Sequence, residues 1–438
     1  MTQHSTSEMR IFIFIWLGQM LSLIGSSLTS FALGIWVYQN TNSVTLLSLI
    51  LLSATLPSSL ISPIAGVLVD RWERRWVMII SDFGAGLSTL ALALLFFTLG
   101  KIEIWHICVA LAVSSGFSAF QLPAYNAATT LLVPKQYLAQ SSGMIQLGRA
   151  VAQLLSPILG GLLLVTIQLQ GIILIDFLTF LFGIIPLLLV RFPELKITNT
   201  NHSETIKKSS LLQEVISGWN YITARPGLLG LLMFFTTSNF LIGAVEVLIT
   251  PLVLSFTSPA VLGTMTSVAG IGLLLGSLII STRGEPQRLI QNIIGFQLLA
   301  GLSILAVGLR PSILLITLAA FLFFLGWPII NACAQVIFQK KVALNLQGRI
   351  FAIRQMIADA SFPLAYIVAG PLADKVFEPL MVFNGPLAGS IGQIIGVGPG
   401  RGIGLMFIFM GGFTMLVAIT GYHYPRLRLV EDELPDVI

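Results

Sequence analysis

Two acidic side chains of this sequence lie inside long apolar segments. They are Glu246, within the apolar stretch 243–248, and Asp359, near the middle of a later apolar run. A carboxyl in apolar surroundings can exchange protons near neutral pH, so both residues are candidates for proton coupling. The alternative is a carboxyl hydrogen-bonded to a neighbouring helix. For Asp359, five residues after Arg354, we expect a partner on another helix.

Two basic side chains, Arg149 and Arg354, also fall inside apolar segments. A long arginine side chain can reach the nearer membrane surface while its stem stays in apolar surroundings. The same arginines could instead pair with Asp70 or Asp82 where two parts of the chain meet. We expect a structural role for both of these buried basic residues. Asp176 falls near the end of another apolar segment, where a carboxylate close to a helix N-terminus is unremarkable.

Uncharged polar residues supply the remaining chemistry of the apolar segments. A large apolar cavity with scattered hydrogen-bonding groups suits an amphipathic ligand better than a sugar or a phosphate. A sugar needs dense hydrogen bonding, and a phosphate needs converging Arg or Lys. For each residue alone, a contact between helices is the other interpretation. The candidate cavity residues are Gln19, Ser26, Gln121, Tyr125, Asn126, Asn239, Asn331 and Gln335.

The elements that must position these residues are membrane-spanning helices. Residues 11–69 contain no charged side chain and no histidine, which is enough for two crossings of about 20 residues each. Of the 438 residues, 55% are hydrophobic and 9% are charged. The apolar runs predict an all-α membrane protein with twelve transmembrane helices in two six-helix bundles. The twelve expected membrane-spanning helices lie near 11–37, 44–69, 77–99, 104–132, 141–166, 170–190, 227–255, 260–282, 288–309, 312–338, 348–370 and 402–423.

The basic residues predict an orientation. With both termini in the cytoplasm, 17 of the 23 Lys and Arg residues fall in inner segments and four in outer ones. This positive-inside asymmetry predicts an integral protein of the cytoplasmic (inner) membrane. Because the basic residues form no patch, no nucleic-acid partner is expected. The expected partners are the lipid bilayer and a small-molecule substrate, and we expect a monomer.

A polar stretch in the middle of the chain divides it. We expect an N-terminal bundle at 1–194, a cytoplasmic linker with an amphipathic helix at 195–225, and a C-terminal bundle at 226–438. The apolar residues of the linker recur at near-helical spacing, which suits a helix in the inner headgroup layer. A solvated connector is the alternative. An extended outer loop at 371–400 could form a lid or a re-entrant turn.

The two halves of the sequence share an internal repeat. Pairs of identical residues around spans four and five, and again around spans ten and eleven, keep one constant separation. Duplication explains such a pattern better than chance, and it predicts two bundles that face one another. The pairs, each 205 residues apart, are Pro123 and Pro328, Asn126 and Asn331, Lys135 and Lys340, Gly143 and Gly348, and Arg149 and Arg354.

Several kinds of chemistry are missing from the sequence. There is no Gly-rich phosphate loop ending in Gly-Lys-Ser/Thr, so ATP hydrolysis by that route is not expected. The four histidines have no metal-ligand spacing, and no constellation of nucleophile and base is suggested. We therefore expect no enzyme activity, no metal and no cofactor, with the proton as the coupling ion.

The segment Gly66-Val-Leu-Val-Asp-Arg-Trp-Glu-Arg-Arg75 carries a family resemblance. It resembles the signature of the loop between spans two and three in the major facilitator superfamily, with Glu73 where a glycine is usual. The resemblance extends over essentially the whole chain. It implies two pseudo-symmetric six-helix bundles with a central cavity and rocking alternating access.

The same resemblance implies a latch on the cytoplasmic side. Asp70 is expected near the positive N-terminal end of span eleven, around 347–349. For Arg74 and Arg75, simple anchoring at anionic headgroups is the alternative. The latch residues that match the family signature are Gly66, Asp70, Arg71, Arg74 and Arg75.

A second pattern lies in span five. Antiporters of the family carry glycines and a Gly-Pro pair there at fixed spacing, and this chain keeps the spacing with two glycines replaced by other small residues. Small residues let helices approach closely, and proline bends the span. The pattern favours export over import, and ordinary small-residue packing is the alternative. The matching residues are Gly143, Ser156, Pro157, Gly160 and Gly161.

Within the superfamily, the chain resembles the macrolide-efflux and enterobactin-exporter type of drug and metabolite exporters. The residues that carry this are 16–25, 116–126 and 175–176. An arginine common in span four is Val113 here, so its coupling role is not carried over. The resemblance implies a proton-driven secondary exporter, an antiporter, of hydrophobic or amphipathic drugs, antibiotics or natural products. The alternatives are a dedicated exporter of one endogenous metabolite or siderophore, and a non-transporting membrane sensor or assembly component.

Overall fold

A computed structural model describes residues 2–99, 102–190, 192, 219–284, 286, 288–342 and 344–428. Within these residues the chain is helical with short turns and contains no β-strand. Twelve of the described helices are long and apolar enough to cross a membrane. The predicted all-α class and the number of crossings are therefore confirmed.

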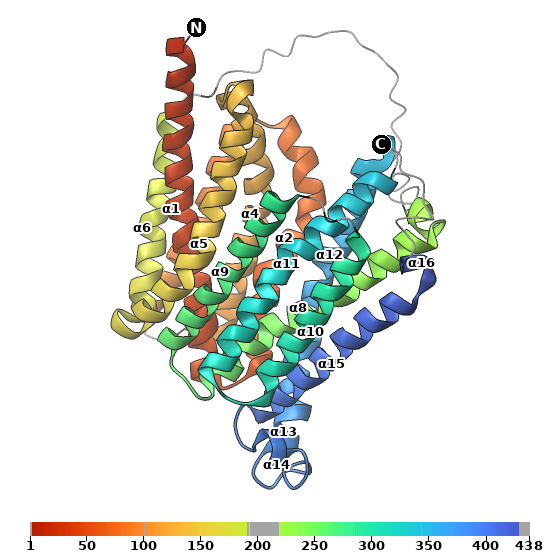
Figure 1. Ribbon diagram of the computed structural model, residues 1–438. Helices are drawn as coiled ribbons and strands as arrows, with labels where there is room; N and C mark the ends of the chain where they lie inside the picture. Colours follow the sequence, from red (N-terminus) through yellow and green to blue (C-terminus); the bar gives the residue numbers. More distant parts are fainter. Residues whose placement is uncertain are drawn as a thin grey trace. The chain divides into compact units, whose positions relative to one another are not determined.

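The helices follow one another along the chain as drawn in Figure 1. They are α1 (Thr2–Thr41), α2 (Val44–Arg71), α3 (Arg74–Leu99), α4 (Ile104–Leu132), the 3-10 turn η1 (Lys135–Tyr137), α5 (Leu138–Thr166), α6 (Gln168–Leu189), α8 (Pro226–Leu254), α9 (Pro259–Arg283), α10 (Leu289–Leu309), α11 (Ile313–Lys341), α12 (Leu344–Leu372), the π-helical η2 (Ala373–Phe377), α13 (Glu378–Met381), α14 (Gly392–Ile395), α15 (Arg401–His423) and α16 (Pro425–Arg428).

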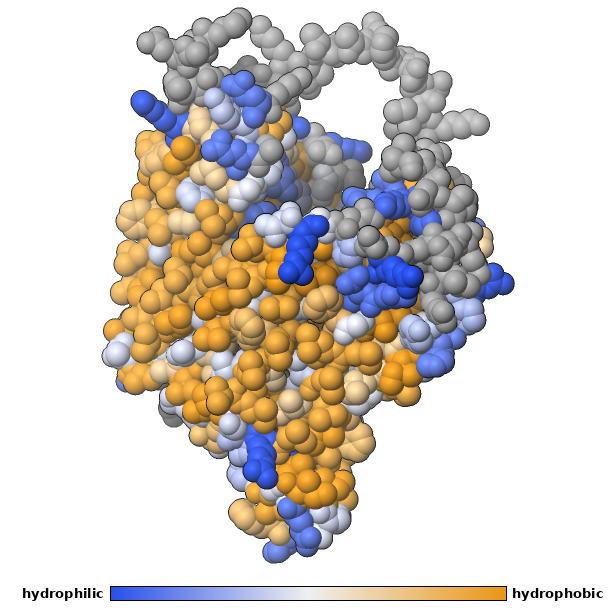
Figure 2. Space-filling view, viewed as in Figure 1, coloured by the Kyte–Doolittle hydropathy of each residue, from blue (hydrophilic) through white to orange (hydrophobic). Residues whose placement is uncertain are grey.

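Apolar side chains cover the outside of these helices. Leu189 is 70% exposed and Leu314 is 79% exposed, and Figure 2 shows hydrophobic side chains over most of the visible face. Contact with water would cost roughly 25 cal/mol per Å² of such surface, whereas hydrocarbon removes that cost. The chain is therefore an integral membrane protein.

The helices divide into two compact units, and the division does not follow the order of the sequence. The C-terminal end of α8, the N-terminal part of α9 and the C-terminal end of α12 belong with the first six helices. The domain boundaries expected around 195–225 stay a prediction. The first unit comprises Met1–Glu194, Val247–Val268 and Tyr366–Val376, and the second comprises Leu195–Glu246, Ala269–Ala365 and Phe377–Ile438.

In the first unit, α1 packs against α5 and α6, while α2 and α3 pack against α4. Gly18 and Gly25 of α1 lie where a Cβ would collide with the carbonyl of Phe182 and the side chain of Thr179 on α6. Small residues of this kind let membrane helices approach closely. The two glycines thereby fix the face of α1 that is turned toward α6.

In the second unit, α10 packs against both α11 and α15. Ile222 is fully buried there, in a core that includes Leu228 and Phe338. Ile222 belongs to the segment 195–225, and at this residue the segment packs into the core of the second unit. The remainder of the predicted linker helix, up to residue 218, lies outside the described residues.

The predicted outer loop at 371–400 is a folded segment. The carboxylate of Glu378 accepts hydrogen bonds from the backbone N–H groups of Gly400 (3.2 Å) and Ile403 (2.9 Å). Nη1 of Arg401 donates to the carbonyl of Ile395 at 3.1 Å. These bonds tie α13 and α14 to the first turn of α15, where unpaired N–H groups favour a carboxylate.

The repeat is visible in the helix bounds. α4 and α11 are both 29 residues long. α5 and α12 are also 29 residues long, and they start at Leu138 and Leu344. The separation of 206 residues between these starts agrees with the offset of 205 found in the sequence.

Candidate functional site

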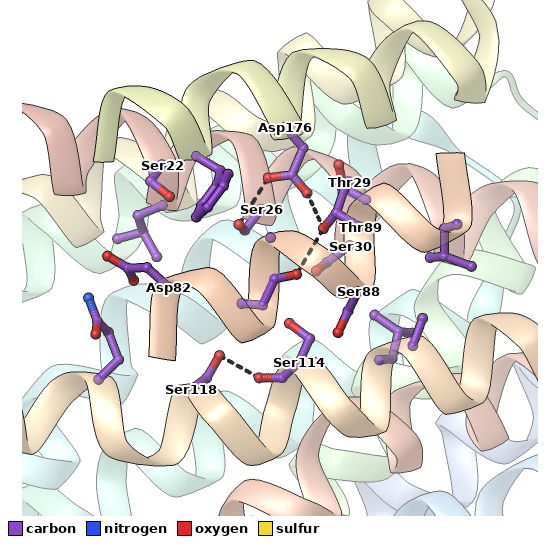
Figure 3. A pocket seen from close by; sticks show the side chains of 18 of the residues that line it. Ser22, Ser26, Thr29, Ser30, Asp82, Ser88, Thr89, Ser114, Ser118 and Asp176 are labelled. Carbon is purple, nitrogen blue, oxygen red and sulfur yellow. Dashed lines mark hydrogen bonds between the residues drawn. The ribbon is translucent and has the colours of Figure 1, made fainter. Parts of the chain in front are cut away.

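A polar stripe runs along α1 inside the first unit. Its side chains recur at helical spacing, so they share one face of the helix. α3, α4 and α6 contribute further polar side chains to the same pocket, as Figure 3 shows. The polar lining consists of Gln19, Ser22, Ser26, Thr29, Ser30, Asp82, Ser88, Thr89, Ser114, Ser118, Gln121 and Asp176.

Asp82 on α3 stands at one end of a chain of hydrogen bonds. Nε2 of Gln19 donates to Oδ2 of Asp82 at 2.8 Å, and Oε1 of Gln19 accepts from Nε2 of Gln121 at 2.7 Å. The three side chains come from α3, α1 and α4, so this series of hydrogen bonds connects three helices. A carboxylate that keeps a free lone pair can accept a proton or a donor group of a ligand.

Asp176 on α6 is the second carboxylate of the pocket. It is only 3% exposed, and it accepts hydrogen bonds from Oγ of Ser26 (3.0 Å) and Oγ1 of Thr89 (3.3 Å). The predicted setting near a helix end is wrong. Ile167 alone separates α5 from α6, so α6 begins at Gln168 and carries Asp176 more than two turns into the helix.

The pocket combines acidic groups with apolar walls. It holds about 870 Å³ of unfilled space, part of it open to solvent. None of the described residues that line it is Lys, Arg or His. Because two carboxylates line this pocket and no described basic residue does, the pocket favours binding of a cationic group or of a proton. Apolar walls are supplied by Leu23, Leu33, Leu92, Leu111 and Phe180.

A second pocket adjoins the first, and the residues that line both are Gln19, Leu23, Ser118 and Gln121. Trp16, Tyr125 and Arg149 complete its polar and aromatic lining. Tyr125 is 9% exposed, and its hydroxyl has no hydrogen-bond partner among the described residues. Arg149 was expected to be buried, but it is exposed, because it faces a pocket open to solvent.

The second unit has a polar pocket of its own, with about 580 Å³ of unfilled space. Arg354 lines it and donates from Nη1 to Oε1 of Gln335 at 2.9 Å. Its guanidinium carbon also lies 5.0 Å from the ring centre of Phe338. The hydrogen bond and the ring hold this cation in place. Asn239 and Asn331 line the same pocket.

Asp359 lies in this pocket too, and its hydrogen-bond partner is not the one we expected. Nε2 of Gln355 donates to Oδ1 of Asp359 at 2.7 Å. Both residues are on α12, four positions apart, so the expected partner on another helix is wrong. Glutamine and aspartate at this spacing face each other on a helix, which makes the local pair easy to form.

Two predicted residues lie away from these pockets. Glu246 is exposed in the C-terminal half of α8, and Asn126 is exposed on α4. Neither is among the described residues that line the pockets above. A coupling role for Glu246 and a cavity role for Asn126 stay predictions.

The residues of the predicted latch differ in their surroundings. Arg75 donates from Nε to the carbonyl of Leu187 and from Nη2 to that of Leu188, both at 2.8 Å. It therefore caps the last turn of α6, where carbonyls lack partners. Arg71 is exposed, and Arg74 is partly buried. A Cβ on Gly66 would meet open space, and the side chain of Asp70 lies outside the described residues.

The small residues of the span-five pattern make close contacts between helices. Oγ of Ser156 donates to the carbonyl of Ile24 at 3.2 Å, which joins α5 to α1. A Cβ on Gly161 would lie 2.5 Å from the carbonyl of Pro259 on α9. A Cβ on Gly160 would lie 2.8 Å from Phe31, whereas Gly143 has open space. Pro157 lies inside α5.

Two pocket residues, Asp82 and Asp176, were not predicted as site residues. The signal that could have found them is the spacing of Ser22, Ser26 and Ser30 on α1. Hydroxyls at every fourth position of an apolar helix mark one polar face. A buried carboxylate on a neighbouring span is then the expected complement of that face.

Comparison with known proteins agrees with the geometry. The family described as Major Facilitator Superfamily matches residues 15–366. Macrolide efflux protein A of Streptococcus pyogenes is 28% identical over 370 residues, covering 83% of this chain and 90% of the relative. Multidrug efflux pump Tap of Mycolicibacterium fortuitum is 24% identical over 358 residues, covering 80% and 86%.

Solved structures show the same fold at lower identity. The crystal structure of the nucleoside transporter NupG superimposes with a TM-score of 0.70 at 13% identity, covering 94% of this chain and 99% of that one. The inward-open xylose transporter XylE from E. coli gives a TM-score of 0.65 at 12% identity, covering 95% and 96%. At such identity the likeness concerns the fold alone.

Proposed function

The chain belongs to the major facilitator superfamily, and we propose that it is a secondary active exporter of hydrophobic or amphipathic small molecules. The substrates in this proposal are drugs, antibiotics or natural products, and macrolides come first because of the relatives named macrolide efflux protein A. The driving force is the exchange of substrate for protons, with alternating access between the two sides of the membrane.

The observation that carries the proposal is the pocket of the first unit. Asp82 and Asp176 lie among hydroxyls and amides on one side and leucines and Phe180 on the other. Such a lining offers apolar contact to the body of an amphipathic molecule and hydrogen bonds to its polar groups. A carboxylate inside a membrane protein marks a site of ion or proton handling by default.

Proton exchange follows from the same lining. A carboxylate that binds a proton loses its negative charge, and with it most of its attraction for a cationic or hydrogen-bond-donating group of a substrate. Proton binding at Asp82 or Asp176 therefore favours substrate release, and substrate binding favours loss of the proton. Glu246 and Asp359 are proposed as further proton-coupling residues.

We further propose the membrane arrangement that this exchange requires. The protein is placed in the cytoplasmic membrane with both termini inside because of the distribution of its basic residues, and it is proposed to act as a monomer. With this orientation the substrate enters the pocket from the cytoplasm or the inner leaflet and leaves to the outside.

The proposal is tested in bacterial cells that lack their own drug exporters. Cells that express the chain should retain less radiolabelled erythromycin and less ethidium than cells with an empty vector. A protonophore should remove the difference, since it collapses the proton gradient. Equal retention of both compounds in the two strains would refute export of these substrates. A difference that survives the protonophore would refute proton coupling.

Two variants connect this assay to the pocket. Asp82→Asn combined with Asp176→Asn keeps the shape of both side chains and removes their exchangeable protons, so export should be lost. Glu73→Gln is the matched control, because Glu73 is an exposed carboxylate between α2 and α3. If the double variant exports as well as the control at equal amounts in the membrane, the pocket is not the coupling site.

A further inference from the structure

The carboxylate of Asp374 caps the N-terminus of α2, a helix that is distant in the sequence. Its Oδ2 accepts hydrogen bonds from Oγ of Ser43 and from the N–H of Thr45, both at 2.8 Å. Its Oδ1 accepts from the N–H of Val44 at 3.0 Å. Asp374 lies in η2, two residues beyond the end of α12, and Ser43 is the N-cap of α2. We call these four residues the outer clasp.

The clasp supplies α2 with a charge that its own sequence lacks. The first turn of α2 contains no Asp or Glu, although a carboxylate there would stabilise the unpaired N–H groups and the positive end of the helix. Ser43 caps only one of these groups, the N–H of Leu46, at 3.2 Å. The charge comes instead from Asp374, 331 positions later in the sequence.

The helix backbones are also in close contact next to the clasp. Gly370, one turn before Asp374, leaves no space for a Cβ, which would collide with Oγ of Ser48 and lie 2.8 Å from Cα of Thr45. Tyr366, Ala369 and Ala373 are at most 2% exposed on the same stretch. The end of α12 thus packs tightly on the start of α2 within the first unit.

We propose that the outer clasp is a gate, which holds the outer end of α12 on α2 and must open each time the substrate pathway opens to the outside. The inference rests on the proposed alternating access. A carboxylate borrowed from a distant helix makes the end of α2 depend on the position of α12, whereas a local cap would not. Release of Asp374 leaves its charge and two N–H groups free for water, so an open clasp is hydrated rather than buried.

The test measures access to a pocket residue and needs no substrate. In a background with Cys108→Ser and Cys333→Ala, a reporter Ser30→Cys is placed in the pocket, where Ser30 is exposed. A membrane-impermeant maleimide is added to intact cells. Adding Asp374→Ala should raise labelling at least about fivefold, because loss of the clasp shifts the population toward the outward-open state.

Two further variants separate a gate from a general loss of structure. Lys375→Ala changes the exposed neighbour of Asp374 and should leave labelling unchanged. Gly370→Ala should raise labelling as Asp374→Ala does, because the added methyl group pushes α12 from α2. Thermal unfolding of each purified variant shows whether it is folded. If Asp374→Ala does not fold, Asp374→Asn and Gly370→Ala carry the test.

The outcomes distinguish this inference from the proposed function. Unchanged labelling in folded Asp374→Ala and Gly370→Ala overturns the gate, whatever the transport assay shows. Raised labelling in a protein that exports neither erythromycin nor ethidium supports the gate and counts against the proposed substrates. Raised labelling in Lys375→Ala as well would assign the effect to general loosening and overturn the gate.

Discussion

Gln19 donates a hydrogen bond from its side-chain amide to Oδ2 of Asp82 across 2.8 Å, and this bond joins α1 to α3 inside the pocket of the first unit. The same amide nitrogen also lies 3.3 Å from the carbonyl of Gly183 on α6. One glutamine therefore links three helices at the carboxylate. A movement of any of these three helices would change the hydrogen bond that Asp82 accepts from Gln19. Such a change would couple proton binding at Asp82 to helix movement.

Asp82→Asn should separate proton coupling from substrate binding. In proteoliposomes, export of ethidium driven by an imposed pH gradient should fall by about tenfold or more, since an amide cannot carry the proton. Exchange of labelled for unlabelled ethidium without a gradient should continue, because that cycle needs no proton movement. If both activities fall together, Asp82 holds the substrate or the fold and is not a proton carrier. Glu73→Gln, in the exposed loop, serves as the control.

Gly25→Ala should disturb the other carboxylate through packing. The added Cβ would collide with the side chain of Thr179 and lie 3.1 Å from Cα of Asp176. Overpacking of this kind typically costs about 1–3 kcal/mol, so thermal unfolding of the purified variant should begin at a lower temperature. Gly143→Ala is the control, because open space surrounds Gly143. Equal stability of the two variants would contradict tight packing of α1 on α6.

Arg75→Lys tests whether this member of the predicted latch is a helix cap. Arg75 reaches two carbonyls of α6 with two nitrogens of one guanidinium, and a lysine ammonium cannot reproduce that fork. Loss of one such hydrogen bond costs roughly 1 kcal/mol, so Arg75→Lys should unfold at a lower temperature. Arg71→Lys, at an exposed position, should not. A variant with full stability but altered outward labelling at Ser30→Cys would favour the latch interpretation instead.

Hydropathy alone was sufficient to predict the twelve helices, because membrane helices are set by length and apolar composition, both of which are local. The equal lengths of α5 and α12 likewise follow from a repeat that can be read in residues such as Arg149 and Arg354. The contacts between helices could not be predicted in this way. Asp374 and Ser43 are 331 positions apart, and neither position stands out in the sequence.

Only part of the site could be predicted, because the sequence does not show which helix faces meet. Gln19, Ser26 and Gln121 are polar residues on apolar helices, and the structure places all three in one pocket. Asp176 was interpreted from its position along a span, which says nothing about the face on which it lies, and Asp82 was considered only as a possible partner of Arg149 or Arg354. The partner of Asp359 is Gln355, four positions before it on the same helix, whereas the charge of Arg354, five positions before it, drew attention to a pair that helix geometry does not favour.

Variants of Arg354 can show whether this residue has a structural role or a role in transport. Its guanidinium bonds Gln335 at 2.9 Å and lies over Phe338 and Phe235, at 5.0 and 5.7 Å from the ring centres, so we expect a structural role. Arg354→Lys keeps the charge and weakens both contacts, which should lower the free energy of unfolding by roughly 1 kcal/mol.

The double-mutant cycle with Gln335→Leu completes this test. If Gln335 is the partner that holds Arg354, the double variant should lose less stability than the sum of the two single variants. Transport of ethidium at equal protein amounts should then follow stability across the three variants. Arg354 also lines the pocket that contains Asp359, so a role in substrate binding predicts a different pattern. Transport would be lost in Arg354→Lys at unchanged stability, and Gln335→Leu would leave transport intact.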